Sequence, residues 1–98
     1  MIDVLKSDTF DKWFRGLRDV RAKARIDQRI ERLAQGNPGD MKAVGGGVPE
    51  MRIDYGPGYR LYYTQRGNAL IILLCGGDKA SQRKDIGAAV KLVEGLKR

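Results

Sequence analysis

Histidine is absent from this 98-residue chain, and cysteine occurs once, as Cys75. Without an imidazole, the chain has no histidine to act as an acid, a base or a metal ligand. A lone cysteine cannot form an internal disulfide, and its position in an apolar run predicts a buried strand residue. This cysteine usage suits a reducing compartment, so we expect a cytoplasmic protein.

Long hydrophobic runs are also missing. No segment approaches the length of a membrane span, and the N-terminal residues show neither a long apolar core nor a cleavage signature. We therefore expect a soluble, unexported protein with no membrane partner. With 98 residues and 42% hydrophobic content, the chain can bury one modest core, which predicts a single domain over residues 1–98.

Basic residues, in contrast, are abundant. Nineteen Lys and Arg residues against twelve Asp and Glu residues give a formal net charge of +7. An excess of this size on a small domain favours a nucleic acid or another polyanion as a partner. Composition alone does not choose between them.

The N-terminal half is predicted to hold a short strand and two helices. Residues 1–6 alternate as a strand does, and Ser7 can cap a helix over residues 8–17. The aromatic residues of that helix recur at helical spacing, which favours burial in the core over stacking on bases. A second helix is predicted over residues 19–35, with Asp19 as its N-cap.

Five arginines lie beside the apolar stripe of the second predicted helix. At about 100° per residue, they occupy an arc of roughly 80°. Because like charges one turn apart cost stability and the arginine fork suits phosphate, we favour a phosphate-binding surface over a solvated face. These RNA-binding candidates are Arg18, Arg21, Arg25, Arg29 and Arg32.

The C-terminal half is predicted to hold three antiparallel strands and a last helix. Residues 37–47 are rich in glycine and are predicted to form a loop. The strands are predicted over residues 50–55, 59–63 and 69–75, separated by glycine-containing turns. The third of them is continuously apolar, which is typical of an interior strand, and the opening strand is its expected second neighbour. A helix is predicted to follow Ser81.

Alternation separates the side chains of the first two of these strands into two faces. The apolar face holds Met51, Ile53, Leu61 and Tyr63, and the charged face holds Glu50, Arg52, Arg60 and Tyr62. We expect Arg60 to point toward an open surface. The element order is then βααβββα, and the predicted fold class is a compact two-layer α+β fold with a small, mostly antiparallel sheet packed against helices.

Three motifs carry a family resemblance that spans nearly the whole chain. They are Glu50-Met51-Arg52, the hairpin Asp54-Tyr55-Gly56-Pro57-Gly58-Tyr59-Arg60 and the strand exit Leu73-Leu74-Cys75-Gly76-Gly77-Asp78-Lys79. On these residues the chain resembles the toxins of the RelE/ParE superfamily, and most closely the HigB-like addiction-module killer branch. The resemblance implies a RelE-like fold and a type II toxin that cleaves mRNA on the ribosome. It also implies a cognate antitoxin, a helix-turn-helix protein of the HigA type.

The resemblance further implies roles for individual residues. Arg60 falls on the arginine that RelE-type enzymes use at the scissile phosphate, and Arg52 falls on the arginine of the adjacent strand. Lys79, Arg83 and Lys84 fall in the basic segment that opens the last helix. The catalytic tyrosine of RelE has no counterpart, since Ile86 takes its place. The absence of histidine also excludes the histidine-assisted variants of the family.

RNA cleavage of this kind moves two protons and stabilises a charged phosphorane, and it needs no metal or other cofactor. Arg52 and Arg60 can stabilise the phosphorane through bidentate donation. Glu50, on the same predicted face, can accept the 2′-hydroxyl proton, while Lys79 or Lys84 can protonate the leaving oxygen. For Glu50, an ordinary cross-strand salt bridge stays open as the alternative.

Two other functions stay open as well. Members of the ParE branch share this fold but bind and poison DNA gyrase without nuclease chemistry, and fold alone does not separate the two. A degenerate module that binds an antitoxin and RNA without cutting is the third reading. The clustered basic residues favour RNA, so we expect an endoribonuclease that inhibits translation.

Overall fold

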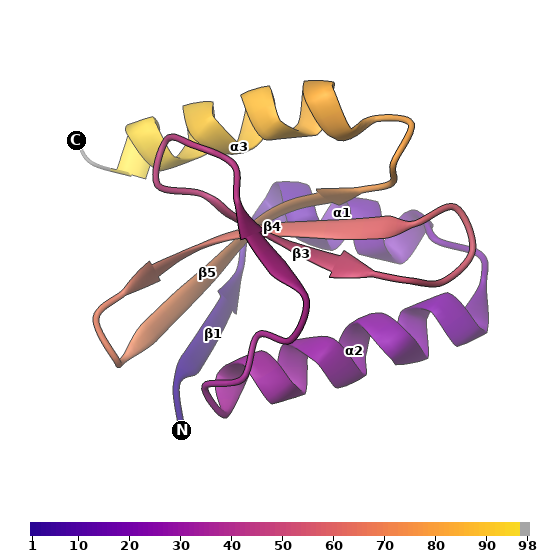
Figure 1. The fold of residues 1–98 in the computed structure, drawn as a ribbon, viewed down its shortest axis with the longest axis horizontal. Coiled ribbons are helices and arrows are strands. Elements are labelled where there is room, and N and C mark those ends of the chain that lie inside the picture. Colours follow the sequence, from indigo (N-terminus) through magenta and orange to yellow (C-terminus); the bar gives the residue numbers. More distant parts are fainter. Residues whose placement is uncertain (97–98) are drawn as a thin grey trace.

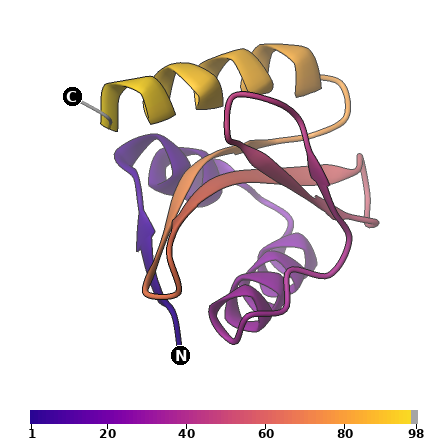
Figure 2. The ribbon, with the colours of Figure 1, turned by 60° about the vertical axis from the view of Figure 1, so that its left-hand side comes forward.

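Five strands form a single sheet in the order β1-β5-β4-β3-β2 in the computed structural model, which describes residues 1–96 (Figure 1). The strands are β1 (Asp3–Lys6), β2 (Met41–Ala43), β3 (Pro49–Ile53), β4 (Tyr59–Arg66) and β5 (Leu70–Gly77). β1 runs parallel to β5, and the other neighbours are antiparallel. The predicted α+β class and the order of the predicted elements are confirmed, and the strands twist strongly across the molecule (Figure 2).

Two of the three helices begin at the predicted caps. The Ser7 hydroxyl oxygen accepts a hydrogen bond from a first-turn N–H of α1 (Asp8–Gly16) at 3.0 Å. The Asp19 carboxylate accepts two such bonds, at 3.0 and 3.2 Å, from α2 (Val20–Ala34). α3 (Gln82–Leu96) is the last helix. Among the helices that residues 1–96 form, none combines the length and apolar character needed to cross a membrane.

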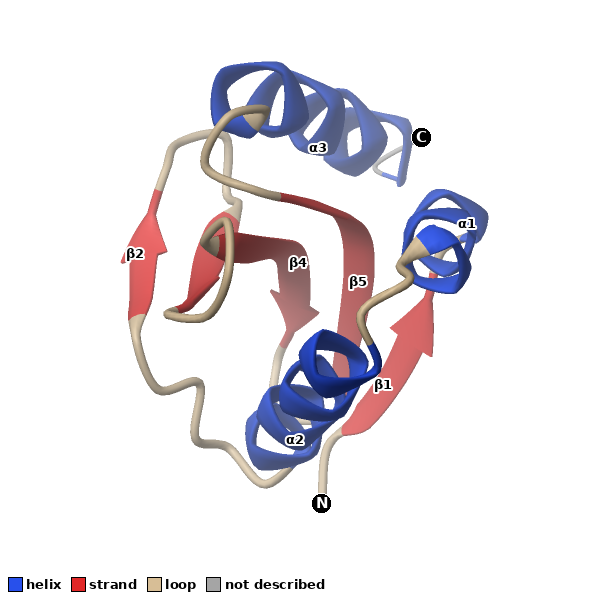
Figure 3. Cartoon of the chain, turned by 90° about the vertical axis from the view of Figure 1, so that its right-hand side faces the viewer, coloured by secondary structure: helices blue, strands red, loops and turns tan. Residues whose placement is uncertain are grey.

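The helices pack on both faces of the sheet. Figure 3 shows α2 and α3 on opposite sides of the strands. The core under α1 and α2 contains Phe10, Ile26, Ile30, Leu33, Met51, Ile53, Leu61, Tyr63, Ile71 and Leu73. The core under α3 contains Val48, Tyr62, Leu74, Cys75, Ala89 and Val93. The predicted alternation of β3 and β4 and the burial of the aromatic helix are confirmed, but a helix covers each face, whereas the sequence predicts two layers.

The residues of β5 explain why the second face needs a cover. β5 lies between β1 and β4, as its apolar run predicts. Its pairing with β4 skips Leu74, because Tyr63 pairs with Leu73 and Tyr62 pairs with Cys75. This bulge turns both Leu74 and Cys75 toward α3. Burial under that helix raises the pKa of the Cys75 thiol to about 12, so it stays protonated at neutral pH.

β2 is an element that the sequence does not predict. It lies inside the glycine-rich segment 37–47 and pairs with β3 through residues 41–43. All three of its residues are exposed, so no apolar alternation marks the strand in the sequence. The pairing brings Asp40, the residue before β2, alongside Arg52.

The glycine pair that ends β5 allows the chain to pass closely between two helices. A Cβ atom on Gly76 would overlap the Trp13 ring, and a Cβ atom on Gly77 would overlap the Asp85 carboxylate. Beyond this exit, the Lys79 backbone N–H donates to the Pro57 carbonyl oxygen at 3.5 Å. The strand exit is therefore held against the turn between β3 and β4.

Candidate functional site

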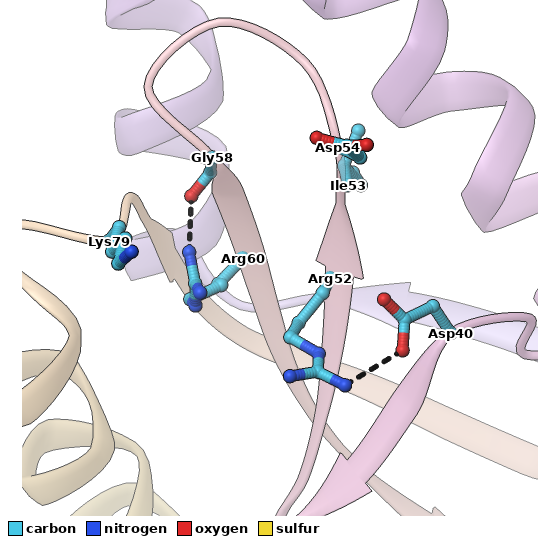
Figure 4. Close-up of a pocket in the computed structure, with 7 residues that line it drawn as sticks. All are labelled: Asp40, Arg52, Ile53, Asp54, Gly58, Arg60 and Lys79. Carbon is cyan, nitrogen blue, oxygen red and sulfur yellow. Dashed lines mark hydrogen bonds and ion pairs between the residues drawn. The ribbon is translucent and has the colours of Figure 1, made fainter.

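A cavity of about 370 Å³ opens beside the β3–β4 turn (Figure 4). Three separate parts of the chain form it: the segment before β2, the β3–β4 hairpin and the loop after β5. Its lining residues are Asp40, Arg52, Ile53, Asp54, Gly58, Arg60 and Lys79. With three cationic and two anionic side chains, the lining is polar and carries a net positive charge.

Arg52 and Arg60 are paired across β3 and β4, and both side chains reach into the cavity (Figure 4). Arg52 forms an ion pair from Nη2 to the Asp40 Oδ1 at 2.9 Å, and 41% of its side chain is exposed. Arg60 donates from Nη1 to the Gly58 carbonyl oxygen at 2.7 Å, and only 12% of its side chain is exposed. Arg60 is therefore held against the protein. The alternation of the strand predicts that its side chain points toward an open surface, and the structure does not show this.

Lys79 supplies the third cation of the cavity. It lies on the loop between β5 and α3, and its side chain borders the space that the two arginines enter (Figure 4). The loop is fixed by a turn in which the Asp78 backbone N–H donates to the Ser81 hydroxyl at 3.2 Å and the Ser81 N–H donates to the Asp78 carboxylate at 3.1 Å. Three of the predicted cations thus share one cavity, although they come from β3, from β4 and from the loop after β5.

Glu50 lies beneath the cavity and does not line it, since its side chain has no exposed surface. Its Oε2 accepts hydrogen bonds from the Tyr62 hydroxyl at 2.9 Å and from the Gln82 side-chain amide at 2.8 Å. The Arg60 Nε lies 3.9 Å from the same oxygen. Burial, and then the hydrogen bond to Glu50, raise the pKa of Tyr62, so the phenol stays a donor. The candidate proton acceptor is therefore sealed from the space where an RNA would lie.

The basic residues at the start of α3 lie outside the cavity. Lys84 is exposed and is not among the lining residues. Arg83 borders a separate hollow of about 230 Å³, together with Gln82 and Ile86. Of the basic segment implied by the family resemblance, only Lys79 joins Arg52 and Arg60.

The five arginines at the edge of α2 divide into two groups. Arg29 is held inside the fold by three hydrogen bonds. Its guanidinium donates to the carbonyl oxygens of Arg52 at 2.6 Å, Pro38 at 3.0 Å and Asp40 at 3.3 Å. Burial, and then the charge of Arg32, lower its pKa. The other four are exposed: Arg18, Arg21, Arg25 and Arg32. Arg25 also stacks over the Tyr55 ring, 4.8 Å from its centroid.

The sequence interpretation missed the two carboxylates of the cavity, Asp40 and Asp54. Asp54 follows Arg52 by two residues at the end of β3, so the alternation that groups Arg52 with Arg60 provides a signal for it. Asp40 gives no such signal, since it reaches the site through the unpredicted pairing of β2. Among residues 1–96, Asp40 forms an ion pair with Arg52, whereas Asp54 forms none.

The fold and the site together define a small basic α+β protein with a cavity of net positive charge beside the turn between β3 and β4. The family model described as "Phage derived protein Gp49-like (DUF891)" matches residues 12–93, so the chain belongs to this family. The family is a toxin-like addiction-module family related to RelE and HigB. The chain is also 50% identical over 95 residues to an uncharacterized protein of Haemophilus influenzae (strain ATCC 51907 / DSM 11121 / KW20 / Rd), covering 97% of this chain and 96% of that protein.

Proposed function

We propose that this protein is the toxin of a type II toxin–antitoxin pair in the cytoplasm and that it is an endoribonuclease acting on ribosome-bound mRNA. The observation that supports this most is the convergence of Arg52, Arg60 and Lys79 on one cavity. Its volume of about 370 Å³ lies in the range of small-ligand sites, enough for a phosphate with its sugar. Membership of a toxin-like family supports the same proposal.

In the proposed reaction, the ribose 2′-oxygen attacks the adjacent phosphorus and the bond to the 5′-oxygen breaks, leaving a 2′,3′-cyclic phosphate and a 5′-hydroxyl. Arg52 and Arg60 stabilise the charge that develops on the phosphoryl oxygens. Asp54 accepts the 2′-hydroxyl proton, in place of the sealed Glu50. Lys79 donates a proton to the leaving 5′-oxygen. Each step uses side chains of the cavity and needs no metal.

The direct test is induced expression without an antitoxin, followed by primer extension on abundant transcripts. We expect growth arrest, a halt in translation and new mRNA ends within reading frames. Purified protein should cut mRNA on ribosomes, and a 2′-O-methyl group at the cut nucleotide should block cleavage because it removes the attacking hydroxyl. Intact transcripts in arrested cells would contradict the nuclease proposal.

The second candidate is binding to DNA gyrase without nuclease chemistry, as in the ParE branch. The burial of Glu50 favours it, because a binding protein needs no exposed proton acceptor at this position. A supercoiling assay with purified gyrase separates the two candidates. Inhibited supercoiling together with intact mRNA would establish gyrase as the target, whereas a protein that binds RNA and inhibits neither process would be a degenerate module.

The proposed partner is an antitoxin encoded by an adjacent gene, and a helix-turn-helix protein of the HigA type fits the family relationship. Complementary charge would speed its encounter with this basic chain. Hydrogen exchange on the co-purified pair distinguishes two modes of inhibition. Protection near Arg52, Arg60 and Lys79 would mean that the antitoxin fills the cavity. Protection confined to residues 8–35 would mean that it blocks access to the ribosome, and failure to form a complex would contradict the toxin–antitoxin proposal.

A further inference from the structure

Glu50 is a carboxylate whose two oxygens lie in different surroundings. Oε2 accepts the hydrogen bonds from Tyr62 and Gln82, at 2.9 and 2.8 Å. Oε1 is buried and has no hydrogen-bond partner within residues 1–96. Burying a carboxylate is costly unless a cation or several donors compensate for the lost water. The nearest compensating cation is Arg60, whose Nε lies 3.9 Å from Oε2.

Arg60 is held from two sides by this arrangement. Its Nε faces Glu50 and is buried without a hydrogen-bond partner in the described part of the chain. Its Nη1 donates to the Gly58 carbonyl oxygen at 2.7 Å. Residues 1–96 supply no acceptor for Nη2, which leaves this nitrogen free for a ligand in the cavity. A planar guanidinium that donates a hydrogen bond from Nη1 and faces a carboxylate with Nε has its Nη2 in a defined direction.

We infer that Glu50 is a positioning residue that acts through Arg60 and does not exchange a proton with RNA. Where RNA cleavage is the measurement, this inference rests on the proposed nuclease function. The carboxylate fixes the Arg60 guanidinium from behind, so that the Nη2 edge faces the cavity. Tyr62 and Gln82 fix the carboxylate in turn. Through Gln82, the first turn of α3 is tied to β3 and to the orientation of Arg60.

The first test needs no enzymatic activity. Nitrogen-15 NMR of the full chain observes the Nε–H group of Arg60, assigned by its loss in Arg60→Lys. In the wild type and in the exposed-surface control Glu94→Gln, we expect a dispersed, slowly exchanging signal. In Glu50→Gln, the carboxylate charge is lost and the side-chain amide of the new residue faces the Arg60 Nε instead. The Arg60 signal should therefore move to the average chemical shift of mobile arginines. An unchanged signal in Glu50→Gln would overturn the inference.

The second test compares the pH dependence of RNA cleavage by the wild type and by Glu50→Gln. A misplaced Arg60 should lower kcat by about a hundredfold without changing the shape of the pH–rate profile. A general base at position 50 would instead give a profile whose acidic limb disappears in the variant. Loss of that limb would overturn the positioning role.

A third measurement separates failure of this inference from failure of the proposed function. If the wild type does not cut RNA, affinity for a 2′-O-methyl oligonucleotide still reports on Arg60, and we expect about tenfold weaker binding by Glu50→Gln. Circular dichroism shows whether the variant is folded. Should Glu50→Gln not fold, Tyr62→Phe removes one support of the carboxylate and should broaden the Arg60 signal, whereas an unaltered signal there would count against the inference.

Discussion

Arg52 and Arg60 lie directly opposite each other on β3 and β4, so two guanidinium groups share one face of the sheet (Figure 4). Like charges in direct cross-strand pairs destabilise a sheet, by about 0.2–1 kcal/mol. Asp40 offsets the charge of Arg52 and Glu50 that of Arg60. A bound phosphate would relieve the repulsion that remains between the two guanidinium groups. A site that binds an anion is expected to lower the stability of the free protein in this way.

Arg52 is the arginine whose function can be tested without disturbing the fold. Arg52→Gln loses an exposed ion pair to Asp40 but relieves the repulsion from Arg60, so the free energy of unfolding should change by less than about 0.5 kcal/mol. RNA cleavage should fall by about a hundredfold or more, because one donor to the phosphorane is lost. Thermal melting and a cleavage assay measure the two effects, with Arg15→Gln on α1 as the control. Equal cleavage by both variants would contradict the assignment.

The glycine pair at the end of β5 should tolerate no side chain. Gly76→Ala would push on the Trp13 ring and Gly77→Ala on the Asp85 carboxylate, and we expect each to cost about 1–3 kcal/mol of stability. Gly87→Ala is the matched control, because nothing lies within 4 Å of its added Cβ. Alanine there should stabilise α3 by about 0.5–1 kcal/mol. Chemical denaturation measures all three, and an unaltered midpoint for Gly77→Ala would disprove the close contact.

The cap of α2 should make stability depend on acid pH. The Ala22 backbone N–H is the main cause that lowers the pKa of Asp19, and the Tyr55 hydroxyl, which donates to it at 3.0 Å, contributes. Because this pKa is lower in the folded chain, the ionised carboxylate stabilises the fold at pH values above its pKa in the unfolded chain. The contribution is lost as the pH falls through the pKa of the folded chain, below about pH 4. Asp19→Asn keeps a capping oxygen that does not titrate. Its Tm should therefore fall less steeply than that of the wild type between about pH 4 and pH 2, and parallel curves would refute the linkage.

The exposed arginines of α2, together with Arg18 just before that helix, are proposed to bind RNA phosphates. Replacing Arg18, Arg21 and Arg32 by Gln should weaken ribosome association and lower its log–log salt slope by about 0.9 per lost contact. Arg29→Gln is the contrasting variant, because it removes the guanidinium donors from three carbonyl oxygens, of which that of Asp40 keeps the Arg52 backbone N–H as a further donor. This change should cost about 1–3 kcal/mol of stability instead. Co-sedimentation across a salt series gives the slopes. If the triple variant has the wild-type slope, the surface is only solvated.

Local patterns in the sequence suffice for most of the fold. Ser7 and Asp19 mark helix starts because a capping oxygen acts within three residues of its own position. The period of two in β3 separates Met51 from Arg52, and the apolar run of β5 predicts an interior strand. Local patterns do not predict on which side of the sheet α3 packs, because that depends on which face remains uncovered after α1 and α2 have docked.

The sequence by itself determined the order of the elements other than β2, the grouping of Arg52 with Arg60 and the excess of positive charge, because each follows from residue type and short-range spacing. Only the tertiary structure decided that Glu50 is buried and accepts a hydrogen bond from Gln82, 32 residues away, and that the Arg29 guanidinium donates to backbone carbonyl oxygens. Only the structure brought Asp40 to Arg52, through a strand too short and too exposed to leave a pattern. Whether a charged side chain meets solvent, an RNA or another part of the chain depends on contacts between distant segments, and no local pattern encodes those.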